Sequence, residues 1–178
     1  MPFYWYPESL FDLMKQYGFG LEGFLYSFSV AGIAAVGYEF LEKRRAVKIK
    51  RNKKLHLGPF LLFILVYVGL EVFFPTKPMI NLSLAFICGI ISTALLRPDL
   101  LKQILASGLI FGVFYFIFFV FINTMFKDFI GQFYSPQLFG NFKILGVPLE
   151  EIFGAFTGGA FWSTIYEYTK SYREKRVS

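Results

Sequence analysis

The chain alternates between long apolar runs and short polar segments. Each run is continuously apolar over about 17 to 26 residues, without the two-residue alternation of a half-buried strand, which favours helices. About 20 predominantly apolar residues form a helix that crosses the hydrocarbon core of a bilayer. The pattern therefore predicts an all-α integral membrane protein, a bundle of five transmembrane helices. The expected spans are residues 21–42, 58–74, 79–96, 101–126 and 148–169.

The segments outside the spans divide the chain into three expected parts. Residues 1–20 are aromatic and interrupted by Pro7, and they lack the basic start and small-residue cleavage site of a signal peptide. We expect them to form an N-terminal interfacial segment, with Trp5 at the depth of the lipid headgroups. Residues 21–170 would then form a single five-span domain, and residues 171–178 a basic cytoplasmic tail.

Composition supports the membrane interpretation. Of the 178 residues, 56% are hydrophobic, 21% are aromatic and only 17% are charged. A soluble domain of this size has too little interior for so many apolar side chains. The one cysteine, Cys88, excludes an internal disulfide, and the one histidine, His56, lies in a basic loop and fits a membrane interface. Because no Cys/His cluster or glycine-rich phosphate loop occurs, we expect no metal and no cofactor.

The Lys and Arg residues predict the orientation of the chain. Eight lie between the first and second spans, two flank the turn between the third and fourth, and four follow the fifth, which places 14 of the 18 on one side. The positive-inside rule puts this side in the cytoplasm and the N-terminus outside. We therefore expect a protein of the plasma (inner) membrane of a prokaryote. The net charge of +6 would face anionic lipid, and we expect no nucleic-acid partner.

The first and last spans resemble each other at an offset of 128 residues. At this offset Glu22 aligns with Glu150, and the Tyr-Glu pair at 38–39 aligns with the pair at 166–167. Both spans also end in a basic cluster. Because both would run from outside to inside, the sequence predicts a parallel repeat, unlike the inverted repeats of many transporters.

Polar side chains of all five spans fall at a similar depth, in the outer half of the membrane. They are Glu22, Glu71, Asn81, Asn123, Thr124, Glu150 and Glu151. A carboxylate inside a span costs a few kcal/mol or more, so such a layer indicates a functional site. Glu22, Glu150 and Glu151 also fit a structural role, since acids in a first helical turn complement the helix dipole. Glu71, near a helix C-terminus, has no such explanation and is the strongest functional candidate.

Helical spacing aims one of these acids toward the interior of the bundle. Glu151, Ala155, Gly158 and Trp162 follow one stripe of the fifth span, and glycines beside them permit close helix contact. A carboxyl group kept neutral in a dry site can donate a proton, as a general acid must. The candidates for substrate contact are Asn81, Asn123, Trp162 and Tyr166.

The acidic motif resembles that of a known family. The stretch GVPLEEIFGAF at residues 146–156, with its Pro-x-Glu-Glu start and the YEY that follows ten residues later, is similar to the lycopene cyclase domain family of small carotenoid-pathway membrane proteins. Members of that family are built from paired helical units, and the first copy GLEGFLYSFSVAGIAAVGYEF resembles such a unit. In this copy Gly20 and Gly23 replace the proline and the second glutamate.

The resemblance implies an isomerase-type activity, an acid-catalysed and redox-neutral cyclisation of a linear isoprenoid or carotenoid. It implies catalytic roles for Glu150 and Glu151, with Glu22 as their counterpart in the first copy. Glu71 joins them on its expected depth alone. The implied partners are membrane lipid and an isoprenoid or carotenoid ligand, and the incomplete repeat is compatible with a homo-oligomer or a hetero-oligomer.

Two other functions fit the same residues. The outer carboxylates would also serve a small transporter or another proton- or cation-binding membrane protein, which cation-dependent uptake into liposomes would favour. The acids would be helix caps only in a non-catalytic lipid-binding or scaffold subunit. Tolerance of Glu-to-Gln substitutions would favour this last function.

Overall fold

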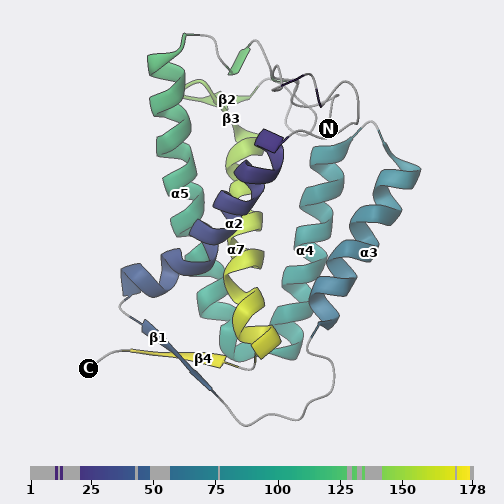
Figure 1. Cartoon of the computed structure of the whole chain (residues 1–178), viewed down its shortest axis with the longest axis vertical. Helices are drawn as coiled ribbons and strands as arrows, with labels where there is room; N and C mark the ends of the chain where they lie inside the picture. The colour runs from purple at the N-terminus through teal and green to yellow at the C-terminus, as the bar shows by residue number, and fades with distance from the viewer. Residues whose placement is uncertain are drawn as a thin grey trace.

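The computed structural model describes residues 11, 13, 21–42, 44–48, 57–75, 77–127, 130–131, 134, 142–170 and 172–176. This part of the chain is mainly helical and contains five long α-helices (Figure 1). They are α2 (Leu21–Glu42), α3 (Gly58–Phe73), α4 (Pro78–Leu96), α5 (Leu101–Met125) and α7 (Leu149–Lys170). The five predicted helices are confirmed, with each boundary within one residue of its expected place. Most of the predicted interfacial segment lies outside the described residues.

Prolines define the starts of three helical segments. Pro59 and Pro78 lie in the first turns of α3 and α4, and Pro98 begins the short 3₁₀ helix η2 (Pro98–Leu100) that leads into α5. A proline suits these positions because its fixed φ is helical and its missing N–H has no partner in a first turn. The connections from α3 to α4 and from α4 to α5 are therefore short.

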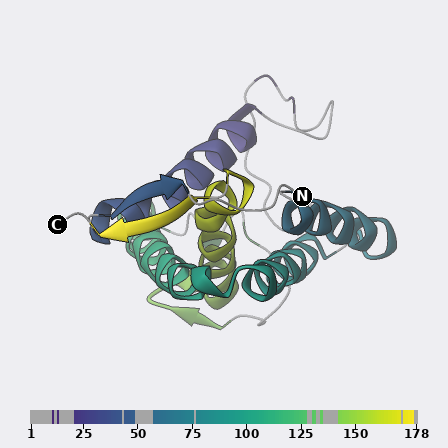
Figure 2. The ribbon, with the colours of Figure 1, turned by 90° about the horizontal axis from the view of Figure 1, so that it is seen from below.

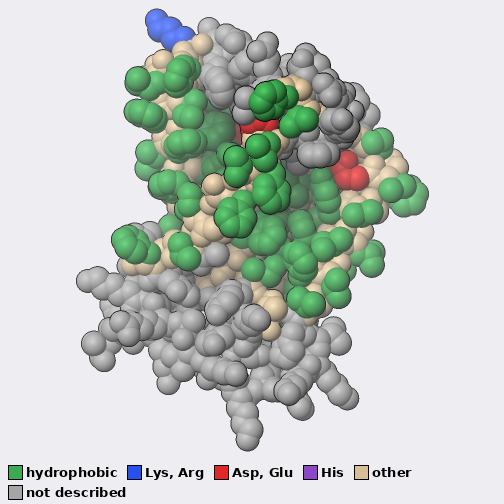
Figure 3. Space-filling view, viewed as in Figure 1, with side chains coloured by type: hydrophobic (Ala, Val, Ile, Leu, Met, Phe, Trp, Pro, Cys, Tyr) green, Lys and Arg blue, Asp and Glu red, His purple; other side chains and the backbone are tan. Residues whose placement is uncertain are grey.

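Two helical segments, Pro78–Leu96 and Pro98–Met125, are long and apolar enough to cross a membrane, and α3 is a shorter apolar helix. Hydrophobic side chains cover most of the described part of the face shown in Figure 3. Phe28 is 72% exposed and Leu65 is 71% exposed. These features support association with a membrane, and a crossing by all five helices stays a prediction.

The helices alternate in direction. α2, α4 and α7 begin at one end of the bundle, and α3 and α5 finish there (Figure 1). We call this the acidic end, because Glu22, Glu150 and Glu151 lie in first helical turns there. At the opposite end, which we call the basic end, β1 (Arg44–Lys48) pairs with β4 (Tyr172–Arg176). Which end faces the cytoplasm stays a prediction.

α7 occupies the middle of the bundle, beside α5, α4 and α2 (Figure 2). Its contact with α5 is close: a Cβ atom added at Gly108 would lie 2.9 Å from the carbonyl oxygen of Phe156. Nearer the basic end, the Gln103 side chain donates a hydrogen bond from Nε2 to the carbonyl oxygen of Ser163 at 3.0 Å. Small residues and one buried amide therefore hold these two helices together.

Aromatic side chains join α3 and α4 to α7. Phe161 of α7 packs 4.9 Å from Phe63 of α3 and 5.6 Å from Phe86 of α4, measured between ring centroids. A Cβ atom at Gly89 would lie 2.5 Å from the Phe161 ring, so only glycine leaves room for it. This cluster forms the core of the half of the bundle that contains α3.

The strand pair at the basic end joins segments that follow α2 and α7. It is antiparallel, and Ala46 lies opposite Glu174, which is 128 residues further along the chain. α2 and α7 each have 22 residues, and their first residues, Leu21 and Leu149, are separated by the same offset. An antiparallel strand pair has a local two-fold axis. Here that axis relates each residue of β1 to the residue of β4 that lies 128 positions further along the chain. The internal repeat itself stays a prediction.

Arg97 is one of the basic residues on which the predicted orientation depends, and the structure buries it. It is 3% exposed. Its Nε and Nη2 atoms donate to Oδ1 and Oδ2 of Asp99, each at 2.7 Å. A bidentate pair of this kind compensates the guanidinium charge within the protein. The predicted orientation therefore depends on the other basic residues at this end.

Candidate functional site

The acidic end collects the polar residues predicted for the site. They are Glu22 (α2), Glu71 (α3), Asn81 (α4), Asn123 (α5), and Glu150 and Glu151 (α7). Because α3 and α5 finish where the other three helices begin, residues from opposite termini of the helices meet at one level. Hydrogen bonds in the described part of the chain join some of them, around Glu151 and around Glu71.

Glu151 is held inside the bundle by a tyrosine of the neighbouring helix. The hydroxyl of Tyr115 on α5 donates a hydrogen bond to Oε2 of Glu151 at 2.9 Å. Glu151 is 9% exposed and Tyr115 is 8% exposed. The prediction that helical spacing turns Glu151 toward the interior is confirmed.

A second tyrosine connects α2 to this pair. The hydroxyl oxygen of Tyr26 lies 2.5 Å from that of Tyr115, so the two form a hydrogen bond. Tyr26 is 47% exposed, and the three polar groups therefore link a buried carboxyl group to the outer part of α2. Neither tyrosine was among the predicted site residues.

Aromatic rings surround the Tyr115 side of the site. The rings of Tyr115 and Phe119 stack with their centroids 4.5 Å apart, and Phe111 lies 6.1 Å from Tyr115. All three are buried residues of α5. The tyrosine that donates to Glu151 is thus part of a buried aromatic stack.

Glu150 is more deeply buried than Glu151, with 1% of its surface exposed. A short hairpin of β2 (Lys143–Ile144) and β3 (Val147–Pro148) leads into α7 just before it. Leu145 and Gly146 form the turn, both with positive φ. Asn123, which was predicted to contact substrate, packs against this turn. A Cβ atom added at Gly146 would lie 2.4 Å from Nδ2 of Asn123.

Glu71 belongs to the group at the α3–α4 connection. Asn81 donates from Nδ2 to Oε1 of Glu71 at 3.1 Å and to the carbonyl oxygen of Phe74 at 2.8 Å. Phe74 is the C-cap residue of α3. Asn81 therefore joins the end of α3 to the start of α4, and Glu71 is one of its two acceptors. This arrangement offers the structural explanation for Glu71 that the sequence lacked.

The remaining predicted residues are Glu22, Trp162 and Tyr166. Glu22 is partly buried in the first turn of α2. Trp162 lies three turns along α7 from Glu151, about 16 Å by helical rise. It packs against the aromatic cluster, 6.3 Å from Phe63 and 5.5 Å from Phe161. The side chain of Tyr166 lies outside the described residues.

In the described part of the chain, no group of three or more His, Cys, Asp and Glu side chains is placed to hold a metal ion.

One known family matches more than half of the chain. The family model described as lycopene cyclase matches residues 77–169, which are 93 of the 178 residues. The chain belongs to the lycopene cyclase family. This membership indicates a lycopene cyclase-like role in a carotenoid pathway. No curated protein and no solved structure gives a significant match to it.

The lycopene cyclase match covers α4, α5 and nearly all of α7. It includes Glu150, Glu151 and Tyr115, and it leaves out Glu22 and Tyr26. The family predicted from the acidic motif is confirmed, but the matched region differs from the one expected. It runs through the middle of the chain, where no motif was recognised, and it does not include the first copy of the repeat.

Proposed function

We propose that the chain is a membrane enzyme that cyclises a linear isoprenoid or carotenoid by acid catalysis, without net oxidation or reduction. The observation that carries this proposal is the buried carboxyl group of Glu151, hydrogen-bonded to Tyr115 within the matched region. A carboxyl group that is shielded from water and held by a donor suits a general acid.

In the proposed reaction Glu151 donates its proton to a terminal carbon–carbon double bond of the polyene. A C–H bond forms as the O–H bond breaks, and a tertiary carbocation remains. A neighbouring double bond attacks this cation and closes the ring. A carboxylate, Glu151 itself or Glu150, then takes a proton from the ring, so that a new double bond forms. The product is an isomer of the substrate, and no oxidant or reductant is consumed.

The carbocation needs stabilisation that does not trap it chemically. Aromatic faces provide it through cation–π attraction. The ring of Tyr115 would provide such a face, and those of Phe119 and Phe111 lie beside it, with centroids 4.5 and 6.1 Å from that of Tyr115. The remainder of a long polyene would extend along α7 toward Trp162 and Tyr166, which we retain as substrate contacts.

The other predicted residues have different roles in the proposed function. Glu22 would be the counterpart of Glu150 in a parallel repeat, supported by the equal lengths of α2 and α7 and by the strand register centred on Ala46 and Glu174. Asn81 and Asn123 would support the ends of helices, as their neighbours indicate. The five helices would all cross a prokaryotic inner membrane, with the basic end in the cytoplasm.

The proposal is tested by pigment analysis in a bacterial host that accumulates lycopene. The unmutated chain is expected to yield cyclic carotenes. Glu151→Gln removes the acidic proton and keeps the shape, and it is expected to lower the yield by about 100-fold or more. Glu150→Gln is expected to have a smaller effect. The matched control is Glu174→Gln, the same change at the basic end, with an unchanged yield.

Two results would contradict the proposal. Lycopene that stays unchanged, with the unmutated chain folded in the membrane, would exclude cyclisation by this chain alone. Cyclic carotenes at full yield from Glu151→Gln would remove Glu151 from the reaction. Purified protein is compared by its thermal unfolding in detergent, so that loss of folding is not mistaken for loss of catalysis.

A further inference from the structure

We propose that Tyr115 and Tyr26 are positioning residues, which hold the Glu151 carboxyl group in the orientation that proton donation requires. The inference rests on the proposed cyclase function, because it concerns the acid of that reaction. It assigns a role in the site to α2, which lies outside the matched region.

The direction of the hydrogen bonds follows from the number of donors. A tyrosine hydroxyl has one hydrogen. With Oε2 of Glu151 as the acceptor, Tyr115 directs its hydrogen to Glu151, so the hydrogen in the contact between the two hydroxyls comes from Tyr26. By donating to the Tyr115 oxygen, Tyr26 leaves the Tyr115 hydrogen pointing toward Glu151. Linked hydrogen bonds of this kind also strengthen one another.

This direction defines which oxygen of Glu151 acts as the acid. When Oε2 of the neutral acid accepts the hydrogen of Tyr115, the proton of that carboxyl group is carried by Oε1. After that proton has moved to the substrate, the hydrogen bond from Tyr115 ends on a charged carboxylate and becomes stronger. An interaction that strengthens as the reaction proceeds lowers the barrier, whereas one of constant strength does not.

Burial makes this positioning effective. Tyr115 is 8% exposed and is stacked on Phe119, so its hydroxyl has little freedom to turn away. Tyr26 is 47% exposed and depends on α2 for its place. Removal of the Tyr115 hydroxyl should therefore have the larger effect, and removal of the Tyr26 hydroxyl a smaller effect in the same direction.

The first test is infrared spectroscopy of the purified full-length chain, recorded as the difference between acid and alkaline pH. The carbonyl stretch of the protonated Glu151 is assigned by its absence from Glu151→Gln. In Tyr115→Phe this band is expected at higher frequency, because the carbonyl oxygen loses its hydrogen bond. Tyr26→Phe should give a smaller shift. Tyr67→Phe, the same change on α3 outside the matched region, should give none.

The second test measures cyclic carotenes from the same variants. Tyr115→Phe is expected to lower the turnover rate by about 10- to 100-fold with little change in KM, and Tyr26→Phe by a few-fold. Tyr67→Phe should match the unmutated chain. If Tyr115→Phe does not fold, both measurements are made on Tyr26→Phe. This variant is expected to fold because the ring of Tyr26 is half exposed.

The outcomes separate this inference from the cyclase proposal. A shifted band in Tyr115→Phe, with no cyclic carotene from the unmutated chain, would support the hydroxyl chain and contradict the cyclase. An unshifted band would overturn the positioning role even if the chain is an active cyclase. Equal turnover in Tyr115→Phe and the unmutated chain would overturn it as well.

Discussion

At the scale of single residues, the carboxylates of the acidic end differ in their neighbours. Glu151 accepts a hydrogen bond from a buried tyrosine, whereas Glu71 accepts one from the asparagine that also joins the end of α3. Glu71 was the strongest candidate on sequence because an anion near a helix C-terminus is unfavourable. Its bond to Asn81 offsets that penalty and indicates a structural role.

Substitutions of Glu71 distinguish the two roles. Glu71→Gln keeps a side-chain oxygen that accepts from Asn81, so we expect a yield of cyclic carotene within about twofold of the unmutated chain. Glu71→Ala removes the acceptor and is expected to lower the free energy of unfolding by about 1–2 kcal/mol, measured by denaturation in detergent. If Glu71→Gln folds normally but makes no cyclic carotene, Glu71 is catalytic after all.

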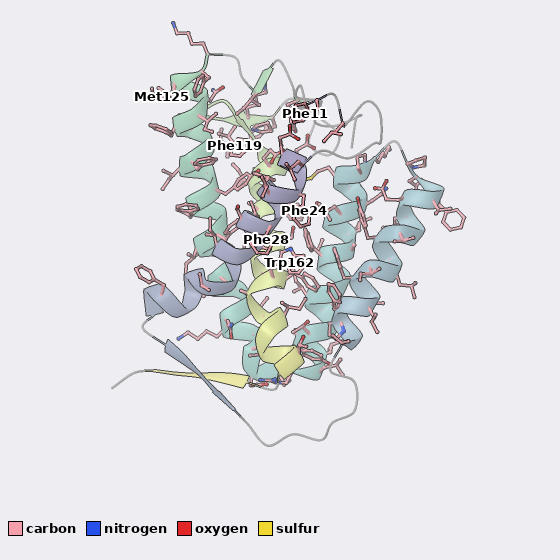
Figure 4. All side chains as sticks on the ribbon, in the orientation of Figure 1. Phe11, Phe24, Phe28, Phe119, Met125 and Trp162 are labelled. Carbon is pink, nitrogen blue, oxygen red and sulfur yellow. The ribbon has the colours of Figure 1, made fainter. Side chains whose placement is uncertain are left out.

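At the scale of elements, the contact between α5 and α7 positions the site. Gly108 and Gly159 allow the two backbones to approach, since a Cβ atom at either would lie within 3.0 Å of its neighbour. This approach brings Tyr115 of α5 within hydrogen-bonding distance of Glu151 of α7. The outer surface of α2 is different: Phe24 and Phe28 project from it and are 68% and 72% exposed (Figure 4).

Because α5 and α7 are in close contact, we expect replacement by alanine to have different effects at Gly108 and at Gly69. Gly108→Ala places a methyl group 2.9 Å from the Phe156 carbonyl oxygen, a backbone atom that cannot move aside without shifting α7. We expect it to lower the free energy of unfolding by about 1–3 kcal/mol and to reduce the carotene yield. Gly69→Ala on α3 has open space around it and should be neutral or slightly stabilising. Equal stabilities in both variants would contradict the close contact.

At the scale of the whole molecule, charge is separated along the bundle. The predicted site lies at the end where α2, α4 and α7 begin, and the strand pair with most of its residues basic lies at the other. Such a distribution favours one orientation in a membrane, because short basic segments of membrane proteins tend to stay in the cytoplasm. The acidic end would then face the outer leaflet.

Cysteine labelling tests this orientation in intact cells. With Cys88 replaced by Ala, a membrane-impermeant thiol reagent should label Lys143→Cys in the hairpin at the acidic end. It should label Ala46→Cys in β1 only after the membrane has been permeabilised. The reverse pattern would contradict the orientation, and labelling of both sites in intact cells would contradict the membrane crossing.

The five helices, their boundaries and the family were determined by local features of the sequence. Apolar runs of a length set by the bilayer, prolines in first turns and the Pro-x-Glu-Glu motif act over short distances, so no tertiary information was needed. The stripe of Gly108, Phe111, Tyr115 and Phe119 was also present, at helical spacing. The sequence did not reveal that this stripe is buried, because an aromatic run in an apolar helix has the same composition whether it faces lipid or protein.

Only the tertiary structure decided which polar groups meet. Tyr26, Tyr115 and Glu151 are separated by 89 and 36 positions in the chain, and their hydrogen bonds depend on how three helices pack. The same packing gave Glu71 a partner on the next helix and buried Arg97 against Asp99. Helical periodicity tells which side of a helix a residue occupies. The depth and rotation of that helix against its neighbours come from side-chain packing between distant segments.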